Sequence, residues 1–343
     1  MMNGNTLKGA LLGAGFFAGF QAEGWQRLPG VEITALADLQ MERAREFAAR
    51  FGIPRVYASA EELLRHERLD FVDIVTRPDS HLPLVELAAA HGTPIICQKP
   101  MAPTWEECLR MVELCQSAGV RLLIHENWRW QIWYREVKKL IEADVFGRIF
   151  HLGFCMRSGD GRGAEPYTVQ PYFRTMPRLL IYETLVHFLD TFRFLAGEIA
   201  TVFCQARRVN PLIAGEDYAV IQLGLTSGAH GLIDANRLAG AVPPEVAFGV
   251  FTLEGERAAL RMTPQGELFI TEYGHPEYRH EYEIPPQGYK GDSVFAAQQH
   301  YAACLRDGLP CETEGEEYLK TVQAMFACYE SAATGRLIRH YRK

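Results

Sequence analysis

Apolar runs alternate with segments of helical spacing through the first third of the chain. Short apolar runs predict strands at residues 31–38, 70–76, 93–97 and 120–125. Segments with helical spacing lie between them, at residues 41–52, 80–92 and 104–119. Thr104 with Glu107 three residues later predicts a capping box at the start of the last of these helices. Strands that alternate with helices predict a doubly wound parallel sheet, whose ligands bind at the carboxyl ends of the strands.

After Gly147 the pattern changes to an alternation of apolar and polar positions. This alternation is typical of an antiparallel sheet with one buried face, and it recurs at residues 150–156, 217–236 and 250–273. Two further segments predict helices, an apolar one at 177–197 and a long amphipathic one at 313–335. We therefore expect a second domain of the α+β class with a mostly antiparallel open sheet, over residues 127–343.

The composition is that of an ordinary globular protein. The 343 residues exceed one compact core, which agrees with two domains. The net charge of −7, without a local basic patch, argues against a nucleic-acid partner. The eight cysteines show neither CxxC nor zinc-ligand spacing, which favours buried thiols in a cytoplasmic protein and no metal site. No apolar run approaches the ~20 residues that span a bilayer, so no membrane association is expected.

A glycine-rich turn follows the first apolar run of the chain. Residues 13–18 read Gly-Ala-Gly-Phe-Phe-Ala, the G-x-G-x-x-A form of the dinucleotide fingerprint. Gly13 permits the tight turn, Gly15 lets the backbone approach a pyrophosphate, and the small Ala18 lets the helix pack on the strand. The same turn supplies two further candidates for cofactor contact, Phe16 and Phe17. A glycine turn without a ligand is the alternative interpretation.

Asp38 ends the next predicted strand, close to the offset expected for the acid that binds the adenosine ribose. The residues that follow it are Leu39, Gln40 and Met41, so no arginine stands directly beside it to accept a 2′-phosphate. We therefore expect NAD rather than NADP as the cofactor, bound by a Rossmann domain over residues 1–126.

Three polar side chains stand at the carboxyl ends of other predicted strands: Thr76, Lys99 and His125. Lys99 is the most informative, because it leaves a buried strand and is followed by Pro100. Such a lysine is either a solvated strand end or a group that the fold holds over a bound ligand.

Glu183 and His187 are four residues apart, so on a helix they share one face. Removal of a hydride from a carbinol requires its hydroxyl proton to leave, and histidine, with an unperturbed pKa of ~6.5, is suited to accept it. An ordinary pair on a helix surface is the alternative. The spacing with Asp190 also permits a metal site, although NAD already supplies the hydride chemistry.

Together these residues resemble the glucose–fructose oxidoreductase/inositol dehydrogenase (Gfo/Idh/MocA) family over nearly the whole chain. The resemblance rests on the glycine turn, Asp38, Thr76-Arg77-Pro78, His81, Gln98-Lys99-Pro100, Glu183 and His187. The family pattern has Glu-Lys-Pro and, further along the chain, Asp-x-x-x-His. This chain departs from it with Gln98, which can still hydrogen-bond a ribose hydroxyl, and with Glu183, which keeps a carboxylate on a longer side chain.

The resemblance implies roles for individual residues. Lys99 would contact the substrate hydroxyl and the nicotinamide side, directed by a trans peptide bond to Pro100. His187 would be the general base and Glu183 would orient the substrate, although Lys99 could be the base instead. The implied cofactor contacts are Gly13, Gly15, Phe16, Phe17, Asp38, Thr76, Pro78, His81, Gln98, Lys99 and Asn127. The implied substrate contacts are Lys99, Asn127, Arg129, Trp130, Arg157, Tyr172, Glu183 and His187. For His81, a purely structural contact is as good an interpretation as a contact with the cofactor. Asp190 is expected to stabilise its own helix rather than to react.

Residues 125–136 carry three tryptophans and two arginines where the first domain ends. Aromatic faces and Arg129 could form a wall against a sugar, and the family position of Asn127 and Arg129 implies that they face the cleft. Packing between the domains is the alternative for Trp130 and Trp133.

The sequence therefore predicts a cytoplasmic NAD-dependent sugar dehydrogenase that oxidises an aldose at its anomeric carbon to a lactone. Several stretches resemble the subgroup of the family that acts on D-apiose: residues 6–19, 96–102, 125–131, 157–159, 170–172 and 207–219. Oxidation of a ring alcohol, as in inositol dehydrogenases, and a non-catalytic NAD-binding sensor remain alternatives. The resemblance to the family further implies a homodimer or homotetramer formed through the open face of the second sheet.

Overall fold

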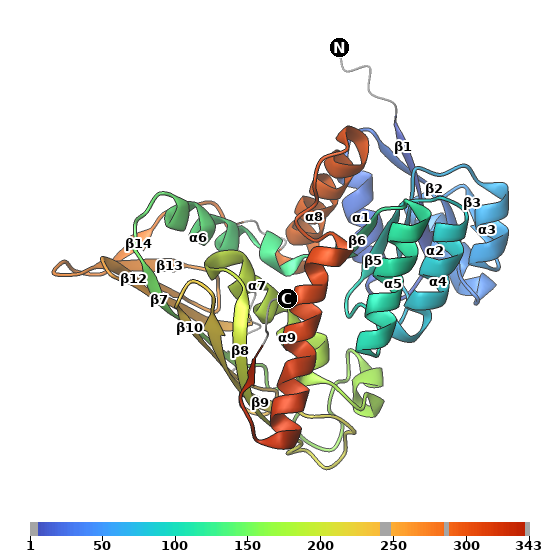
Figure 1. Cartoon of the computed structure of the whole chain (residues 1–343). Coiled ribbons are helices and arrows are strands. Elements are labelled where there is room, and N and C mark those ends of the chain that lie inside the picture. Colours follow the sequence, from blue (N-terminus) through green and yellow to red (C-terminus); the bar gives the residue numbers. More distant parts are fainter. Residues whose placement is uncertain (1–5, 241–247, 285–287, 340–343) are drawn as a thin grey trace. The chain divides into compact units, whose positions relative to one another are not determined.

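The computed structural model describes residues 6–240, 248–284 and 288–339, and the chain forms two compact units (Figure 1). Unit 1 contains Met1–Trp130 and Lys290–Val322, and unit 2 contains Gln131–Tyr289 and Gln323–Lys343. The predicted boundary at residue 126 lies close to the observed one. The segment 290–322 differs from the prediction, because it was expected in the second domain and packs with the first. Helical spacing in a sequence does not reveal which sheet a helix will cover.

Unit 1 is built on a six-stranded parallel sheet in the order β3-β2-β1-β4-β5-β6. Its strands are β1 (Leu7–Leu12), β2 (Val31–Ala37), β3 (Arg55–Tyr57), β4 (Phe71–Ile74), β5 (Ile95–Gln98) and β6 (Leu122–His125). The strand order reverses between β1 and β4, and such a switch point is where Rossmann sheets bind dinucleotides. The predicted doubly wound parallel sheet is confirmed.

The helices that cover this sheet are α1 (Ala18–Arg27), α2 (Met41–Phe51), α3 (Ala60–His66), α4 (His81–Ala90), α5 (Trp105–Ala118) and α8 (Gly288–Asp307). The predicted capping box is present, because Thr104 and Glu107 bond each other's backbone N–H groups. Helix α8 was not predicted. Its Tyr301 is fully buried, shares the core cluster of Trp25, and donates a hydrogen bond of 3.0 Å to the carbonyl of Ile124.

Unit 2 is built on a nine-stranded sheet in the order β14-β13-β12-β11-β7-β10-β9-β8-β15. Its strands are β7 (Ile149–Arg157), β8 (Ile199–Arg207), β9 (Tyr218–Leu225), β10 (His230–Asn236), β11 (Gly249–Gly255), β12 (Ala258–Met262), β13 (Leu268–Glu272), β14 (Tyr278–His280) and β15 (Ile338–Arg339). All neighbouring pairs are antiparallel except β7 and β10. The mostly antiparallel sheet is thus confirmed. Phe154, Ile233 and Phe251 lie on its buried face.

Helices α6 (Ile132–Glu142) and α7 (Val186–Ala196) pack on one another, and α7 also contacts β7. The predicted helix at 177–197 is in fact a π-helical turn, η4 (Leu180–Leu185), followed by α7. The predicted C-terminal helix is confirmed as α9 (Gly315–Thr334), which begins in unit 1 and ends in unit 2. Within the described residues, none of the helices has the length and apolar character needed to cross a membrane.

Candidate active site

The glycine turn joins β1 to α1 at the switch point of the first sheet. Gly13 has a φ of +107°, and a Cβ there would lie 2.8 Å from the carbonyl oxygen of Val75, so only glycine fits. A Cβ on Gly15 would meet no protein atom within 4 Å, which leaves one side of the turn open to a ligand. Ala18 is fully buried, as a helix packed closely on a strand requires. This turn fits the pyrophosphate of a dinucleotide.

Asp38 follows β2 and is held by three groups. Its carboxylate accepts hydrogen bonds of 2.8 Å from the backbone N–H groups of Ala14 and Gln40, and Arg43 lies 2.7 Å away. Burial by itself would raise the pKa of Asp38, but these hydrogen bonds and the Arg43 charge lower it below its ordinary value. Arg43 was not predicted as a partner of Asp38, because it lies five residues further along the chain and the first turn of α2 brings it back to the carboxylate.

We expect Asp38→Ser to relax the choice between NAD+ and NADP+. The change removes the carboxylate that we expect to bond the ribose hydroxyls, and it frees Arg43 to pair with a 2′-phosphate. The KM for NAD+ should rise about tenfold or more, and the KM for NADP+ should fall, as measured by steady-state kinetics with each cofactor. In the double variant Asp38→Ser/Arg43→Ala the gain with NADP+ should disappear. A gain that survives in the double variant would contradict this role of Arg43.

The loop after β4 is braced by a buried histidine. Thr76 accepts a 2.7 Å hydrogen bond from Ser80, at the end of the short helix η1 (Pro78–Ser80). His81 is fully buried, with its ring nitrogens 3.0 Å from the carbonyl of Met101 and 3.2 Å from that of Thr76. Burial lowers the pKa of His81. These contacts fit the structural alternative for His81, which ties the Thr76 loop to the segment after Pro100.

Lys99 lies directly after β5, at the sheet edge that also carries Gly13, Asp38 and Thr76. It is half-buried. The Lys99–Pro100 peptide bond is cis, so the expected trans bond was wrong. The tertiary amide of an X–Pro bond favours trans by only ~0.5–1 kcal/mol, and the surrounding structure therefore decides the isomer.

Gln98 makes contacts inside the unit. Its amide nitrogen lies 3.2 Å from Oε1 of Gln21 and 3.3 Å from Nδ1 of His125, and its Oε1 accepts a 3.0 Å hydrogen bond from the backbone N–H of Lys99. The side chain is almost fully buried. The ribose contact that the resemblance implied for Gln98 would have to compete with all three of these bonds.

Asn127 and Arg129 follow β6 and are both buried. Asn127 donates a 2.8 Å hydrogen bond to the hydroxyl of Ser293, and Arg129 donates a 3.3 Å hydrogen bond to the carbonyl of Glu312. Both therefore contact the segment 290–322, which was predicted to belong to the other domain.

The tryptophans of this region differ in their surroundings. The Trp130 ring lies 4.7 Å from the ring of His300 on α8, within unit 1. Trp130 is partly buried, whereas Trp128 is buried and Trp133 is fully buried in unit 2, where its ring abuts Gly266. Trp133 thus serves the core of its own unit.

In unit 2, Glu183 belongs to a network centred on Arg237. Nη2 of Arg237 lies 3.2 Å from the Glu183 carboxylate, and Nη1 donates a 2.6 Å hydrogen bond to Asp160. The hydroxyl of Thr184 bonds both Glu183 and Arg237. Arg237 is buried, so the charge of Glu183 has a fixed partner. Arg237 was not predicted, because a lone arginine after a strand carries no sequence signal of such a role.

The π-helical turn that presents Glu183 is anchored by Glu216. This carboxylate accepts hydrogen bonds from the backbone N–H groups of Leu179 (3.2 Å) and Ile181 (2.9 Å) and from the hydroxyl of Tyr329 (2.7 Å). It satisfies N–H groups that a helix start leaves without partners. The π turn is a geometry often found at functional sites, and the apolar spacing of the segment did not predict it.

His187 lies in the first turn of α7 and is buried. The hydroxyl of Thr191 donates a 2.8 Å hydrogen bond to its carbonyl, as in ordinary helical back-bonding. Asp190 is fully buried, with Nη1 of Arg193 3.9 Å from its carboxylate. This contact agrees with the predicted bracing role of Asp190.

Arg157 and Tyr172 were expected in the substrate pocket. Arg157 ends β7 and donates hydrogen bonds to the carboxylate of Asp234 and, at 2.8 Å, to its carbonyl, so that it bridges β7 to β10. Tyr172 is 40% exposed, and its hydroxyl accepts a 2.9 Å hydrogen bond from Gln170. Of the two, Tyr172 is the more accessible to a small molecule.

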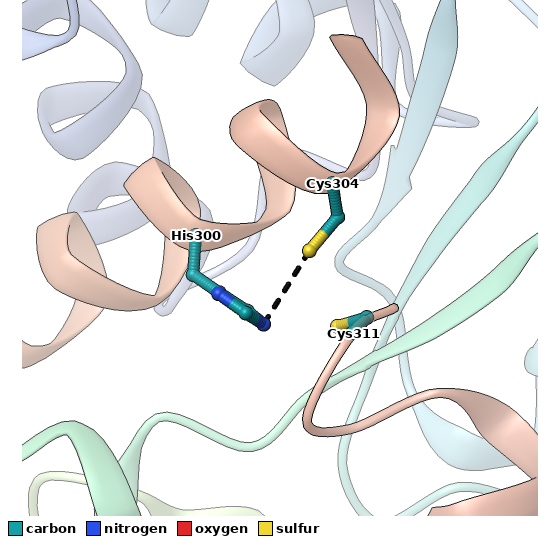
Figure 2. Close-up of side chains that lie close together, drawn as sticks. All are labelled: His300, Cys304 and Cys311. Carbon is teal, nitrogen blue, oxygen red and sulfur yellow. Dashed lines mark hydrogen bonds between the residues drawn. The ribbon is translucent and has the colours of Figure 1, made fainter. Parts of the chain in front are cut away.

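Across the described residues, one group has side chains close enough together to hold a metal ion, namely His300, Cys304 and Cys311, whose ligand atoms lie within 4.8 Å of one another (Figure 2). Nε2 of His300 accepts a 3.0 Å hydrogen bond from the backbone N–H of Glu312, and the Cys304 thiol lies 3.3 Å from the carbonyl of Pro310. Burial raises the pKa of Cys311 to about 12. In this structure His300 and Cys304 are thus hydrogen-bonded to the backbone of the segment that joins α8 to α9.

The glycine turn, the Asp38 carboxylate at the end of β2 and the reversal of strand order are the features of the cofactor domain of an NAD-binding oxidoreductase. A model of the Gfo/Idh/MocA oxidoreductase family, with its NAD-binding Rossmann fold, matches residues 7–126, and a model of the family's C-terminal domain matches residues 134–261. The chain belongs to the Gfo/Idh/MocA family and is an NAD-dependent oxidoreductase.

Two curated relatives are similar to nearly the whole chain. A D-apiose dehydrogenase of Rhizobium rhizogenes is 36% identical over 98% of both chains. A D-apiose dehydrogenase of Paraburkholderia graminis is 37% identical over 96% of this chain and 89% of its own. A crystal structure of an oxidoreductase from Agrobacterium radiobacter in complex with NAD+, L-tartaric acid and magnesium has a TM-score of 0.92 at 35% identity, covering 97% of this chain and 98% of that one.

Proposed function

We propose that this protein is a sugar dehydrogenase that oxidises an aldose at its anomeric carbon to the lactone, with D-apiose as the first candidate substrate. The observation that carries the proposal is the position of Lys99, which leaves β5 at the sheet edge of the glycine turn and Asp38. A cation at that edge lies on the side where the cofactor binds. The names of the two relatives at 36% and 37% identity support the choice of sugar.

The proposed reaction gives a separate role to each of three side chains. Bound NAD+ would supply the acceptor for the hydride that leaves C1 of the cyclic sugar. Lys99 binds the hydroxyl on C1, and its charge favours loss of the hydroxyl proton. His187 accepts that proton, either directly or through Lys99, as the C1–O bond becomes the lactone carbonyl. Glu183, held by Arg237, orients the sugar through its remaining carboxylate lone pairs.

A substrate panel tests this proposal. Purified protein is mixed with NAD+ and, separately, with D-apiose, other aldoses and inositols, and NADH formation is followed by absorbance, with NADP+ as the cofactor control. Turnover confined to D-apiose and NAD+ is the expected result. Turnover only with an inositol would reject oxidation at an anomeric carbon. Intact NAD+ binding with no turnover on any substrate would favour a non-catalytic sensor.

We also propose that two or more copies associate through the open face of the unit 2 sheet. One face of each central strand is buried, whereas the other presents half-exposed or exposed side chains, including Phe150 (45% exposed) and Leu232 (37% exposed). Light scattering coupled to size-exclusion chromatography should give the mass of a dimer or tetramer. A monomer mass at micromolar concentration would contradict this proposal.

A further inference from the structure

A line of buried polar side chains runs from the middle of the unit 1 sheet to Lys99. Gln21 on α1 places its Nε2 2.8 Å from both carboxylate oxygens of Asp73 on β4. The Oε1 of Gln21 accepts a hydrogen bond of 3.2 Å from Gln98, whose own Oε1 accepts one of 3.0 Å from the backbone N–H of Lys99. Asp73, Gln21, Gln98 and this N–H group form what we call the amide network.

The two ends of the amide network determine the direction of every bond in it. At one end the N–H of Lys99 can only donate. At the other end Asp73 faces donors, because the indole N–H of Trp25 lies 2.7 Å from its Oδ2 and the Gln21 amide contacts both oxygens. Each amide between these ends offers an oxygen that accepts and an NH2 group that donates. Nδ1 of His125, 3.3 Å from the Gln98 amide nitrogen, can accept the second N–H of that group, so one orientation satisfies all of the bonds.

Asp73 and Gln21 are fully buried, and Gln98 is 6% exposed. Burial raises the pKa of Asp73 to about 7, and the bonds from Trp25 and Gln21 act in the opposite direction. Two acceptors that face each other inside such a site leave buried polar groups without hydrogen-bond partners. This lowers the free energy of unfolding, because no water supplies the missing hydrogen bond.

We infer that Gln98 is a positioning residue for Lys99, and that Asp73, acting through Gln21, requires an amide rather than a carboxylate at position 98. The inference deepens the proposed function and rests on it, because it assumes that Lys99 touches the substrate. It also accounts for the departure of this chain from the Glu-Lys-Pro pattern. With Gln98→Glu, a carboxylate oxygen faces the Oε1 of Gln21, and the bond between residues 21 and 98 is lost.

The amide network can be reversed by a second substitution. With Asp73→Asn, the new side chain can accept from Trp25 and donate to Oε1 of Gln21. Gln21 then turns its amide and donates toward position 98, where a carboxylate accepts that bond and still accepts the N–H of Lys99. In the double variant every group of the amide network therefore has a partner again. Nδ1 of His125, 3.3 Å from the side chain at position 98, then donates to the carboxylate in the tautomer that carries the proton on Nδ1. Each single variant keeps one mismatched contact within the amide network.

The experiment compares the wild-type protein, Gln98→Glu, Asp73→Asn and the double variant at pH 8.5, above the pKa of Asp73 at about 7. The matched control is Gln299→Glu, the same chemical change at an exposed position of α8 in the same unit. Three quantities are measured for each protein: the Tm, the Kd for NAD+, and the kcat and KM for the sugar.

We expect Gln98→Glu to lower the Tm by roughly 4 °C and kcat about tenfold, with a smaller change in the KM for the sugar. Asp73→Asn should lower kcat in the wild-type background but raise it in the Gln98→Glu background, to within about threefold of wild type. The control should match wild type. The inference would be overturned if the double variant lost kcat by the product of the two single-variant losses. It would also be overturned if Gln98→Glu had the Tm and kcat of the wild-type protein.

The outcomes separate this inference from the proposed function. A wild-type protein that oxidises no sugar would reject the proposed function, and the Tm values would still test the direction of the amide network. Recovery of the Tm without recovery of kcat would overturn the positioning of Lys99 by Gln98.

Discussion

Replacement of Lys99 by alanine is expected to lower kcat for sugar oxidation by about 100- to 10,000-fold, which is the usual contribution of a group that assists proton removal. The Kd for NAD+ should stay within about threefold of wild type. The reason is that the glycine turn and Asp38, which we expect to hold the pyrophosphate and the ribose, follow other strands of the sheet. Single-turnover kinetics and equilibrium titration with NAD+ measure the two quantities separately.

The matched control is Lys8→Ala, because Lys8 is an exposed lysine of the same unit, on the first strand. It should keep wild-type kcat. A Lys99→Ala protein with more than about a tenth of wild-type kcat would contradict the role of Lys99, because general acid–base groups contribute far more than that.

His187→Asn is expected to lower kcat by a similar factor of about 100 to 10,000, since asparagine keeps the polar volume but cannot accept a proton. The variant should keep the wild-type Tm, and its pH profile should lose the acidic limb of kcat/KM, where protonation of the base stops the reaction. The measurement is kcat/KM between pH 5 and pH 10 for both proteins.

His230→Asn is the control, because His230 is an exposed histidine of the same unit on β10. It should leave the profile unchanged. If the acidic limb of the profile persists in His187→Asn, His187 is not the base. If the acidic limb is then lost in a Lys99 variant, Lys99 is the base.

The parts of the fold that sequence could predict are those determined by neighbouring residues. The glycine turn, the capping box at Thr104 and the hairpin between β9 and β10 follow from local spacing, so pattern alone identified them. Lys99 and Asp38 were recognised for the same reason, because each ends a strand of clear periodicity.

The features that sequence could not predict depend on contacts between distant segments. Gln98 meets Gln21 across 77 positions and Arg237 meets Glu183 across 54. The segment 290–322 covers the first sheet because residues such as Tyr301 find partners there, and no local pattern encodes that choice. The π-helical turn at Glu183 likewise requires the carboxylate of Glu216, which lies on a different segment.

In the proposed reaction a hydride leaves the anomeric carbon of an aldose, and an isotopic label on that carbon follows the hydride. D-Apiose deuterated at C1 is oxidised by the protein with NAD+, and the reduced cofactor is analysed by mass spectrometry. The deuterium should appear in the cofactor, and kcat or kcat/KM should be lower than with unlabelled sugar. Reduced cofactor without deuterium, with the label retained in the oxidised sugar, would show that another carbon is oxidised and would rule out the proposed reaction.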